Sequence, residues 1–374
     1  MDKAGFTHYM LKEIFENGRA VRDTVLDRVS PATGKVSLEG MKITAEEFRA
    51  LKKINIVASG TSRHAGLAGA IMLKELAHVP VIVDHASEFE YSNPMTGPGE
   101  LTILITQSGE TADTIGALRE AKAKGSKTLA ISNVVGATIA READAVIYTH
   151  AGPEIAIAST KAFTAQLAAL FLFAVYLAEV RGVISAEQAQ KCTRELLAIP
   201  AKIECVLAHN TACEDIAERN FLANDFLFLA RAVHFPIALD GALKLKETSY
   251  IHAEGYPAGE VKHGPYALID ATMPVVFLAA KDDSDEGSVL RYEKSLQNMK
   301  DVRERLGRVI VVATEGDEEV EKITNQVVLV PKAPELLLPL LEVVPLQLMA
   351  YHIACRRGVN VDNPRNLVKA VTVE

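Results

Sequence analysis

The stretch Asn55-Ile-Val-Ala-Ser-Gly-Thr-Ser62 contains a short β-branched run that ends in a polar turn. An Ala- and Leu-rich segment follows it as far as Leu76 and is typical of a helix. Four more runs of strand type alternate with helical stretches, at 80–84, 101–106, 127–132 and 145–149. Because strands that alternate with helices pair in parallel, we expect an α/β fold with a doubly wound parallel sheet flanked by helices.

The second half of the chain repeats this plan at two fixed offsets. Adding 172 to the residue numbers carries Leu73-Lys-Glu75 onto Leu245-Lys-Glu247, and the strand 101–106 onto 273–278. Adding 181 carries the strand 127–132 onto 308–313, and Pro153-Glu154 onto Pro334-Glu335. The offset changes within the loop region 282–288, where insertions are tolerated. The repeat predicts two tandem copies of one α/β unit.

We expect three parts along the chain. Residues 1–47 form an N-terminal helical arm, residues 48–215 form the first domain, and residues 216–374 form the second. The second domain ends in a tail, 362–374, which has no helical pattern and which we expect to be ordered by docking. A length of 374 residues is that of two ordinary domains.

The composition is that of a soluble protein with a large core. Hydrophobic residues make up 49% of the chain, and the net charge of −8 without a long basic run speaks against a nucleic-acid partner. The longest apolar run, 167–178, is shorter than a membrane span and predicts a buried helix. No secretory signal follows Met1, and the four cysteines lack zinc-type spacing. We therefore expect a cytoplasmic protein with no membrane association.

A hydroxyl-rich loop, Thr106-Gln-Ser-Gly-Glu-Thr111, follows the third expected strand and opens a helix. Backbone N–H groups at such a helix start hold anions, and Gly109 lets the backbone approach a ligand. The turn Gly60-Thr-Ser62 should face the same crevice, because ligands gather where the strands of doubly wound sheets end. Each hydroxyl alone is typical of a helix cap, but two clusters favour a site for a phosphate monoester. Nucleotide-binding glycine motifs are absent, so we expect the phosphate on the substrate.

The segment Ile155-Ala-Ile-Ala-Ser-Thr-Lys161 follows the fifth expected strand and begins the apolar helix. It is interpreted either as a plain helix start or as a third loop of the same pocket, since loops after strands of one sheet converge.

Lys244 and Glu247 stand three residues apart on an apolar helix of the second copy, so they share a face. Their spacing suits a solvated ion pair, or a general base beside a lysine that positions a substrate oxygen. The polar loop that follows carries His252 and His263 with no metal-ligand spacing, and His263 is the better candidate for acid–base work. Lys369 is interpreted as a solvated side chain or as an amine for carbonyl chemistry.

Together these motifs resemble the isomerase part of the glutamine–fructose-6-phosphate aminotransferase (glucosamine-6-phosphate synthase) family, which consists of two sugar-isomerase (SIS) domains. The resemblance covers nearly the whole chain and rests on Ser59-Gly-Thr-Ser62, Thr106-Gln-Ser-Gly-Glu-Thr-Ala-Asp113, Ala158-Ser-Thr-Lys-Ala-Phe163, Gly241-Ala-Leu-Lys-Leu-Lys-Glu247, Tyr250-Ile-His-Ala-Glu254 and the tail 364–374.

The resemblance implies a role for each matching residue. Glu247 would move a proton between C1 and C2 of the sugar, Lys244 would orient the C1 oxygen, and His263 would assist ring opening. Lys369 would form a Schiff base with the ketose carbonyl. The substrate-binding residues would be Gly60, Thr61, Ser62, Thr106, Gln107, Ser108 and Thr111 around the phosphate, and Ile157, Ala158 and Ser159 at the sugar.

The substrates implied are fructose 6-phosphate and ammonia, with glucosamine 6-phosphate as the product and no metal or organic cofactor. In this family the histidine reaches the pocket from the partner subunit, so a homodimer with shared active sites is also implied.

Three departures from the family pattern bear on these expectations. Ser59 replaces the expected Cys, Thr106 replaces the expected Ser, and the family's N-terminal glutaminase domain is absent. The chain is therefore interpreted as the isomerase part of the synthase or as a stand-alone enzyme, including a glucosamine-6-phosphate deaminase. The remaining alternative is a non-catalytic module that senses sugar phosphates.

Overall fold

The computed structural model describes residues 2–30, 32–38 and 41–372. It divides into two compact units, each described here by itself. The first-sheet unit comprises Arg19–Glu154, Lys161–Ala198 and Val368–Glu374, and the second-sheet unit comprises Met1–Gly18, Ile155–Thr160 and Ile199–Leu367. The predicted domain limits, 48–215 and 216–374, stay a prediction about sequence units.

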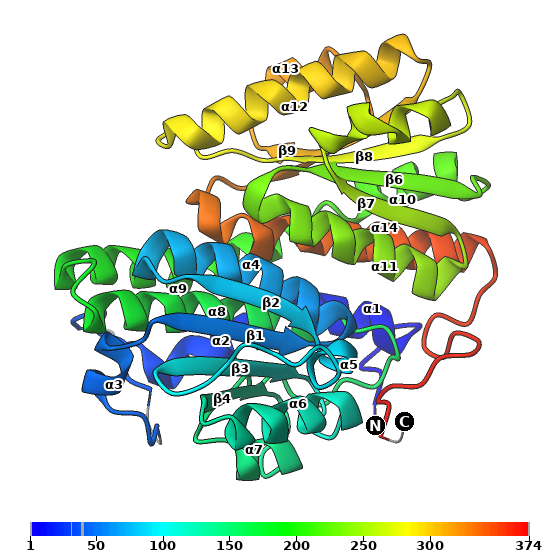
Figure 1. Cartoon of the computed structure of the whole chain (residues 1–374). Helices are drawn as coiled ribbons and strands as arrows, with labels where there is room; N and C mark the ends of the chain where they lie inside the picture. Colours follow the sequence, from blue (N-terminus) through cyan, green and yellow to red (C-terminus); the bar gives the residue numbers. More distant parts are fainter. Residues whose placement is uncertain (1, 31, 39–40, 373–374) are drawn as a thin grey trace. The chain divides into compact units, whose positions relative to one another are not determined.

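The first-sheet unit contains five parallel strands in the order β2-β1-β3-β4-β5. Their bounds are β1 (Lys53–Ala58), β2 (Val81–His85), β3 (Glu100–Thr106), β4 (Lys127–Ser132) and β5 (Ala145–Tyr148). Helices cover both faces of the sheet (Figure 1): α4 (Gly60–Ala77) and α8 (Lys161–Val180) cover one, and α6 (Ala112–Ala123) and α7 (Thr138–Glu142) the other. Burial on both faces explains why these strands are almost continuous runs of Ile, Leu, Val and Ala.

The second-sheet unit also contains five parallel strands, in the order β7-β6-β8-β9-β10. Numbered within its own unit, each strand takes the same place in the sheet as its counterpart in the first. They are β6 (Asp225–Ala230), β7 (His252–Pro257), β8 (Pro274–Ala279), β9 (Arg308–Thr314) and β10 (Val327–Val330). One face is covered by α10 (Asn210–Asn220), α11 (Phe235–Ser249) and α14 (Pro339–Arg356), and the other by α12 (Glu286–Glu304) and α13 (Glu318–Glu321). The predicted α/β fold with two copies of one parallel-sheet unit is confirmed.

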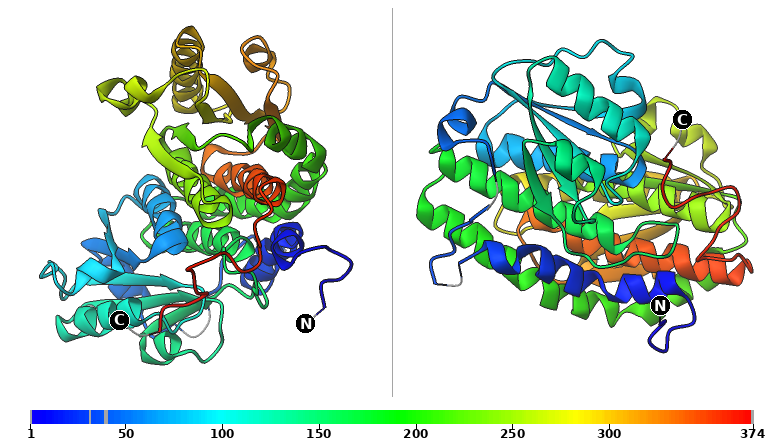
Figure 2. Two further views of the ribbon diagram at one scale, coloured as in Figure 1. Left: turned by 90° about the vertical axis from the view of Figure 1, so that its right-hand side faces the viewer. Right: turned by 90° about the horizontal axis from the view of Figure 1, so that it is seen from below.

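The remaining helical elements complete the two units. They are α1 (Tyr9–Phe15), α2 (Asn17–Val25), α3 (Ala45–Arg49), α5 (Ala86–Phe89), α9 (Ala186–Leu207), η1 (Leu26–Arg28), η2 (Ala232–His234), η3 (Glu260–His263), η4 (Pro265–Leu268) and η5 (Glu335–Leu337). The predicted N-terminal arm contains α1, α2 and η1, although residues 1, 31, 39 and 40 lie outside the described part of the chain. The predicted tail runs without helix or strand to the last described residue, 372, and ends beside α6 (Figure 2).

Two helical segments, Lys161–Val180 and Glu335–Arg356, are long and apolar enough to cross a membrane by length and composition. The structure buries 83% and 94% of their apolar windows. Close packing contributes to this burial in the first-sheet unit, because Gly69 of α4 lets Leu170 of α8 approach its backbone. Such burial is that of core helices in a soluble protein, as predicted for 167–178.

A buried charged cluster joins four helical elements, α11, α12, η5 and α14, at the carboxyl edge of the second sheet. His234, at the start of α11, contacts Glu342 of α14 through Nδ1 at 2.6 Å and Glu335 of η5 through Nε2 at 3.1 Å. Glu335 also accepts hydrogen bonds from Ser288 and from Nε of Arg291 (2.8 Å), both in α12. The cluster therefore links these helices by polar contacts that are buried except at the partly exposed Arg291.

The charges in this cluster stabilise one another. Burial alone would lower the pKa of His234, but the charge of Glu342 and hydrogen bonds with Glu335 and Glu342 raise it to about 10. Burial alone would raise the pKa of Glu335, but His234, Ser288 and Arg291 lower it to about 2. In the folded chain His234 therefore stays protonated at pH values well above its ordinary pKa of 6.5.

Substitution of His234 by Gln should destabilise the second-sheet unit in a pH-dependent way. Near pH 6 the loss should be about 3–5 kcal/mol, because a buried pair loses one partner. Between the unfolded pKa of 6.5 and the folded pKa of about 10, the unfolded chain releases the proton that the folded chain keeps, so the contribution of His234 fades as the pH rises. The difference in melting temperature between the two proteins should therefore narrow from pH 6.5 to pH 10. His252→Gln, at an exposed histidine, serves as the control. A melting-temperature difference between wild type and His234→Gln that does not change with pH would contradict the protonated state assigned to His234.

Candidate functional site

The hydroxyl-rich loop between β3 and α6 gathers the side chains that the sequence predicted. Oγ1 of Thr106 lies 3.1 Å from Oγ1 of Thr111, and Oγ of Ser108 lies 3.5 Å from the same Thr111 atom. Gly109 is required at the turn, because its φ of +73° disfavours other residues and a Cβ there would lie 2.3 Å from that of Ala137. The loop is thus a compact hydroxyl cluster at the start of a helix, which is suited to bind an anion.

The second predicted hydroxyl cluster, Gly60-Thr-Ser62, lies at the same edge of the first sheet. β1 and β3 are neighbours with Ala58 opposite Ile105, so the Gly60-Thr-Ser62 segment follows one strand where the hydroxyl loop follows the next. The structure places this segment in the first turn of α4 and not in a separate turn before the helix. Oγ of Ser62 accepts a hydrogen bond of 3.0 Å from Nε2 of Gln166 on α8. Gln166 was not predicted to be a site residue, because a contact across 104 positions leaves no local sequence pattern.

A positive charge that the sequence analysis did not identify also lies at this edge. Arg63 follows Ser62 in the first turn of α4, and its Nε is buried with no hydrogen-bond partner among the described residues. Burial lowers the pKa of Arg63, and the nearby charge of Asp84 on β2 raises it. Burial, followed by the charge of Arg63, also lowers the pKa of His85 at the end of β2. This edge of the first sheet therefore combines hydroxyl groups with the guanidinium of Arg63.

The C-terminal tail docks onto the first-sheet unit beside the hydroxyl loop. The N–H of Ala112, at the start of α6, donates to the carbonyl of Val371 at 3.1 Å. Nζ of Lys369 donates to Oε2 of Glu154 at 2.6 Å, and the N–H of Ala162 donates to Oε1 of the same carboxylate at 3.1 Å. The Glu154 side chain is fully buried and that of Lys369 is 25% exposed. Lys369 is thus not a freely solvated side chain. Its partner Glu154 was not predicted to be a site residue, because the sequence showed it only as the counterpart of Glu335 in the repeat.

In the second-sheet unit, Lys244 and Glu247 form an ion pair on α11. Nζ of Lys244 lies 2.5 Å from Oε2 of Glu247, with Lys244 fully buried and the Glu247 side chain 22% exposed. A solvated surface pair is therefore the wrong interpretation. Removing an ammonium group from water is costly, so a buried lysine beside a partly exposed carboxylate is typical of a functional pair.

The remaining predicted residues also belong to the second-sheet unit. Ile157 and Ser159 are half-buried and Ala158 is buried, within the loop that precedes α8. His263 ends η3 with an exposed side chain. In the part of the chain that the structure describes, no three His, Cys, Asp or Glu side chains are grouped to hold a metal ion. The predicted absence of a metal cofactor stays a prediction.

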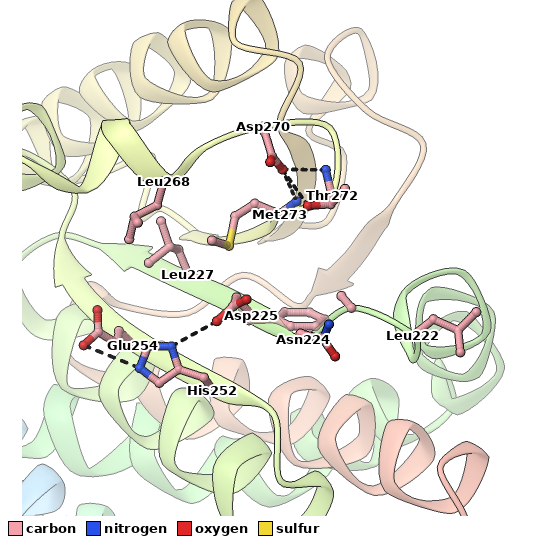
Figure 3. Close-up of a pocket in the computed structure, with 12 residues that line it drawn as sticks. Leu222, Asn224, Asp225, Leu227, His252, Glu254, Leu268, Asp270, Thr272 and Met273 are labelled. Carbon is pink, nitrogen blue, oxygen red and sulfur yellow. Dashed lines mark hydrogen bonds and ion pairs between the residues drawn. The ribbon is translucent and has the colours of Figure 1, made fainter.

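A cavity of about 650 Å³ lies elsewhere in the second-sheet unit, at the amino ends of β6, β7 and β8 (Figure 3). His252 lines the cavity, and its Nδ1 lies 3.1 Å from Asp225 and its Nε2 3.9 Å from Glu254. Leu268 and Met273 add apolar side chains to the lining. None of the predicted site residues lines this cavity. It is therefore distinct from the candidate functional residues, none of which is among its lining residues.

Comparison with known proteins shows that both sheets belong to domains of one family. The SIS domain family matches residues 47–176 and 223–356. The glutamine–fructose-6-phosphate aminotransferase [isomerizing] of Chlorobaculum tepidum is 51% identical over 374 residues, and that of Thermus thermophilus is 48% identical over 373 residues. Each alignment covers 100% of this chain and 60% of the relative, so the chain spans about three fifths of their length.

Solved structures agree with this relationship. The C-terminal domain of glucosamine-fructose-6-phosphate aminotransferase from Francisella tularensis has a TM-score of 0.90 and 38% identity, over 97% of this chain and 100% of that one. A glucosamine-6-phosphate deaminase from Thermotoga maritima has a TM-score of 0.72 at 22% identity, over 97% and 99% of the two chains, and shares the fold. The chain therefore belongs to the SIS domain family, as a tandem of two SIS domains similar over almost its whole length to the C-terminal domain of an aminotransferase.

Proposed function

We propose that this chain is the sugar-isomerising part of a glucosamine-6-phosphate synthase, which converts fructose 6-phosphate and ammonia to glucosamine 6-phosphate and water. The observation that carries the proposal is the buried Lys244 held 2.5 Å from the partly exposed Glu247. A protein that only senses sugar phosphates needs the hydroxyl loop but gains nothing from a buried ammonium–carboxylate pair. The names and extents of the relatives support the same activity.

In this proposal the phosphate is held by Ser62, Gln107, Ser108 and Thr111, with Gly60, Thr61 and Thr106 alongside. Arg63 adds a positive charge next to Ser62. The loop residues Ile157, Ala158 and Ser159 contact the sugar. Anchoring a remote phosphate lets its binding energy orient the carbons that react.

Lys369 forms the Schiff base with the C2 carbonyl, whose oxygen leaves as water, and ammonia then displaces the lysine to give the imine at C2. The attacking amine must lose a proton, and Glu154, 2.6 Å from Nζ, is positioned to accept it. The amine regenerated by displacement returns to the same carboxylate.

Glu247 then removes the proton from C1 and returns it to C2. The C1 hydroxyl gives up its proton, which is balanced by the proton that the imine nitrogen gains, and becomes the aldehyde of the product. One carboxylate able to reach two adjacent carbons is enough for this transfer. Lys244 orients the C1 oxygen through which the electrons rearrange. His263 assists ring opening from a partner subunit, so the proposal includes a homodimer with shared active sites. It also includes a cytoplasmic location, where fructose 6-phosphate is available.

Substitution of Glu247 by Gln tests the proton transfer. The wild-type chain should convert glucosamine 6-phosphate to fructose 6-phosphate and ammonia in the reverse direction. Glu247→Gln should lower this turnover about 10²–10⁴-fold, because the general base is lost, while calorimetric binding of glucosamine 6-phosphate should change little. Lys246→Gln, an exposed position on the same helix, is the control. No turnover by wild-type protein at high concentration would favour a sensing module, and loss of binding in Glu247→Gln would remove the basis of the catalytic assignment.

Reductive trapping tests the role of Lys369. Borohydride added with fructose 6-phosphate should link the sugar covalently to Lys369, because reduction converts the imine to a stable amine. The adduct is located by peptide mass spectrometry. Lys369→Arg keeps the positive charge beside Glu154 but should give no adduct at position 369 and no turnover. An adduct confined to other lysines, or full activity in Lys369→Arg, would contradict the role.

A further inference from the structure

Glu13, a buried acidic residue of the N-terminal helix α1, reaches the loop assigned to the sugar. Its side chain is 1% exposed, and its carboxylate accepts the N–H of Ile155 at 2.5 Å. The N–H of Ala156 lies 3.4 Å from Oε1 and 3.3 Å from Oε2 of the same carboxylate. Two successive backbone donors of the loop therefore point at one carboxylate from a helix far earlier in the chain.

The same loop is held from a second side by Asp362. The carbonyl of Asp362 accepts the N–H of Ile157 at 3.1 Å. Its carboxylate accepts the N–H groups of Tyr9 at 3.0 Å and Met10 at 2.9 Å, at the start of α1. These helix donors have no partner within the helix, and the N-cap residue offers no side-chain bond. Asp362 thus fixes α1, which carries Glu13, and the loop at the same time.

The far end of the loop is held through Gln347 of α14. Nε2 of Gln347 donates to the carbonyl of Thr160 at 3.2 Å, and Oε1 of Gln347 accepts from Nδ2 of Asn17 at 2.8 Å. Both amide side chains are fully buried. Between the fixed N–H of Ile157 and the fixed carbonyl of Thr160 stand only Ala158 and Ser159. The segment assigned to the sugar is thus held at both ends by buried polar contacts.

We infer that Glu13 is a positioning residue for substrate, which holds the loop 155–157 so that Ile157, Ala158 and Ser159 present a fixed surface to the sugar. The inference rests on the proposed function for the sugar contacts, but the clamp itself is independent of any reaction. A carboxylate suits the task because it only accepts hydrogen bonds, whereas a glutamine places an N–H₂ group among the donors. The N-terminal arm is thereby part of the substrate-binding apparatus, a role that its sequence position does not suggest.

Two variants and one control test this inference. Glu13→Gln keeps the size of the side chain and replaces one acceptor oxygen with a donor. Glu13→Asp keeps the charge but is one methylene too short to reach both N–H groups. Glu16→Gln, at the half-buried end of the same helix beside Lys12, is the matched control. Melting temperatures and hydrogen exchange in the strands of both sheets show whether each variant is folded.

The first readout is hydrogen exchange in a peptide that spans residues 155–160, which requires no activity. Exchange in this peptide should be about tenfold faster or more in Glu13→Gln, intermediate in Glu13→Asp and unchanged in Glu16→Gln. Unchanged exchange in a folded Glu13→Gln protein would overturn the clamp, whether or not the wild-type chain is an enzyme.

The second readout is the affinity for glucosamine 6-phosphate, by calorimetry and as KM in the reverse reaction. Glu13→Gln should raise both constants about tenfold with kcat nearly unchanged, because a binding contact common to ground and transition states is weakened. Faster loop exchange with unaltered affinity would overturn the role in substrate positioning. Absence of turnover in wild-type protein would instead contradict the proposed function. In that case the calorimetric affinity for glucosamine 6-phosphate would still test whether Glu13 positions the substrate-binding loop.

Discussion

Parallel pairing of strands is the constraint on which the rest of this protein depends. Five parallel strands must be covered by helices on both faces, and every strand-to-helix turn is then directed to one edge of the sheet. The Ser62 turn and the loop from Thr106 to Thr111 therefore follow neighbouring strands, although they lie far apart in the sequence. The polar groups of the first sheet are brought together by topology and not by proximity along the chain.

The two sheets use this edge differently. Position 62 in the first copy corresponds to His234 in the second at the offset of 172, and Glu154 corresponds to Glu335 at the offset of 181. In the first sheet Ser62 belongs to an edge of hydroxyl groups and one guanidinium, while in the second His234 lies between two carboxylates with no access to water. The two copies of one unit thus differ at this edge, since the first carries hydroxyl groups and a guanidinium and the second is filled by its own charges. The second unit carries its candidate chemistry farther along α11, at Lys244 and Glu247.

Much of the fold could be predicted from the sequence, because buried parallel strands leave an unmistakable local pattern. The expected strand 127–132 is β4 itself, and the expected strand 101–106 differs from β3 by one residue. The shared face of Lys244 and Glu247 also follows from helical spacing, but the burial of Lys244 does not, since it depends on what packs against the helix. Contacts such as Gln166 with Ser62, or Glu13 with Ile155, join residues that are distant in the sequence. No single-sequence pattern records them, and these contacts orient the candidate site.

The docked tail also has a consequence for the order in which the protein is completed. Residues 368–372 are part of the first-sheet unit, and Asp362 holds α1 near the other end of the chain. A ribosome makes the strands β1 to β5 before it makes Lys369 and Val371, so the hydroxyl edge can be assembled before its tail is present. The same holds for α1, whose start must wait for Asp362. The amine assigned to the sugar therefore reaches its place only after the strands β1 to β10 have been made, and a nascent chain that has folded its sheets still lacks it.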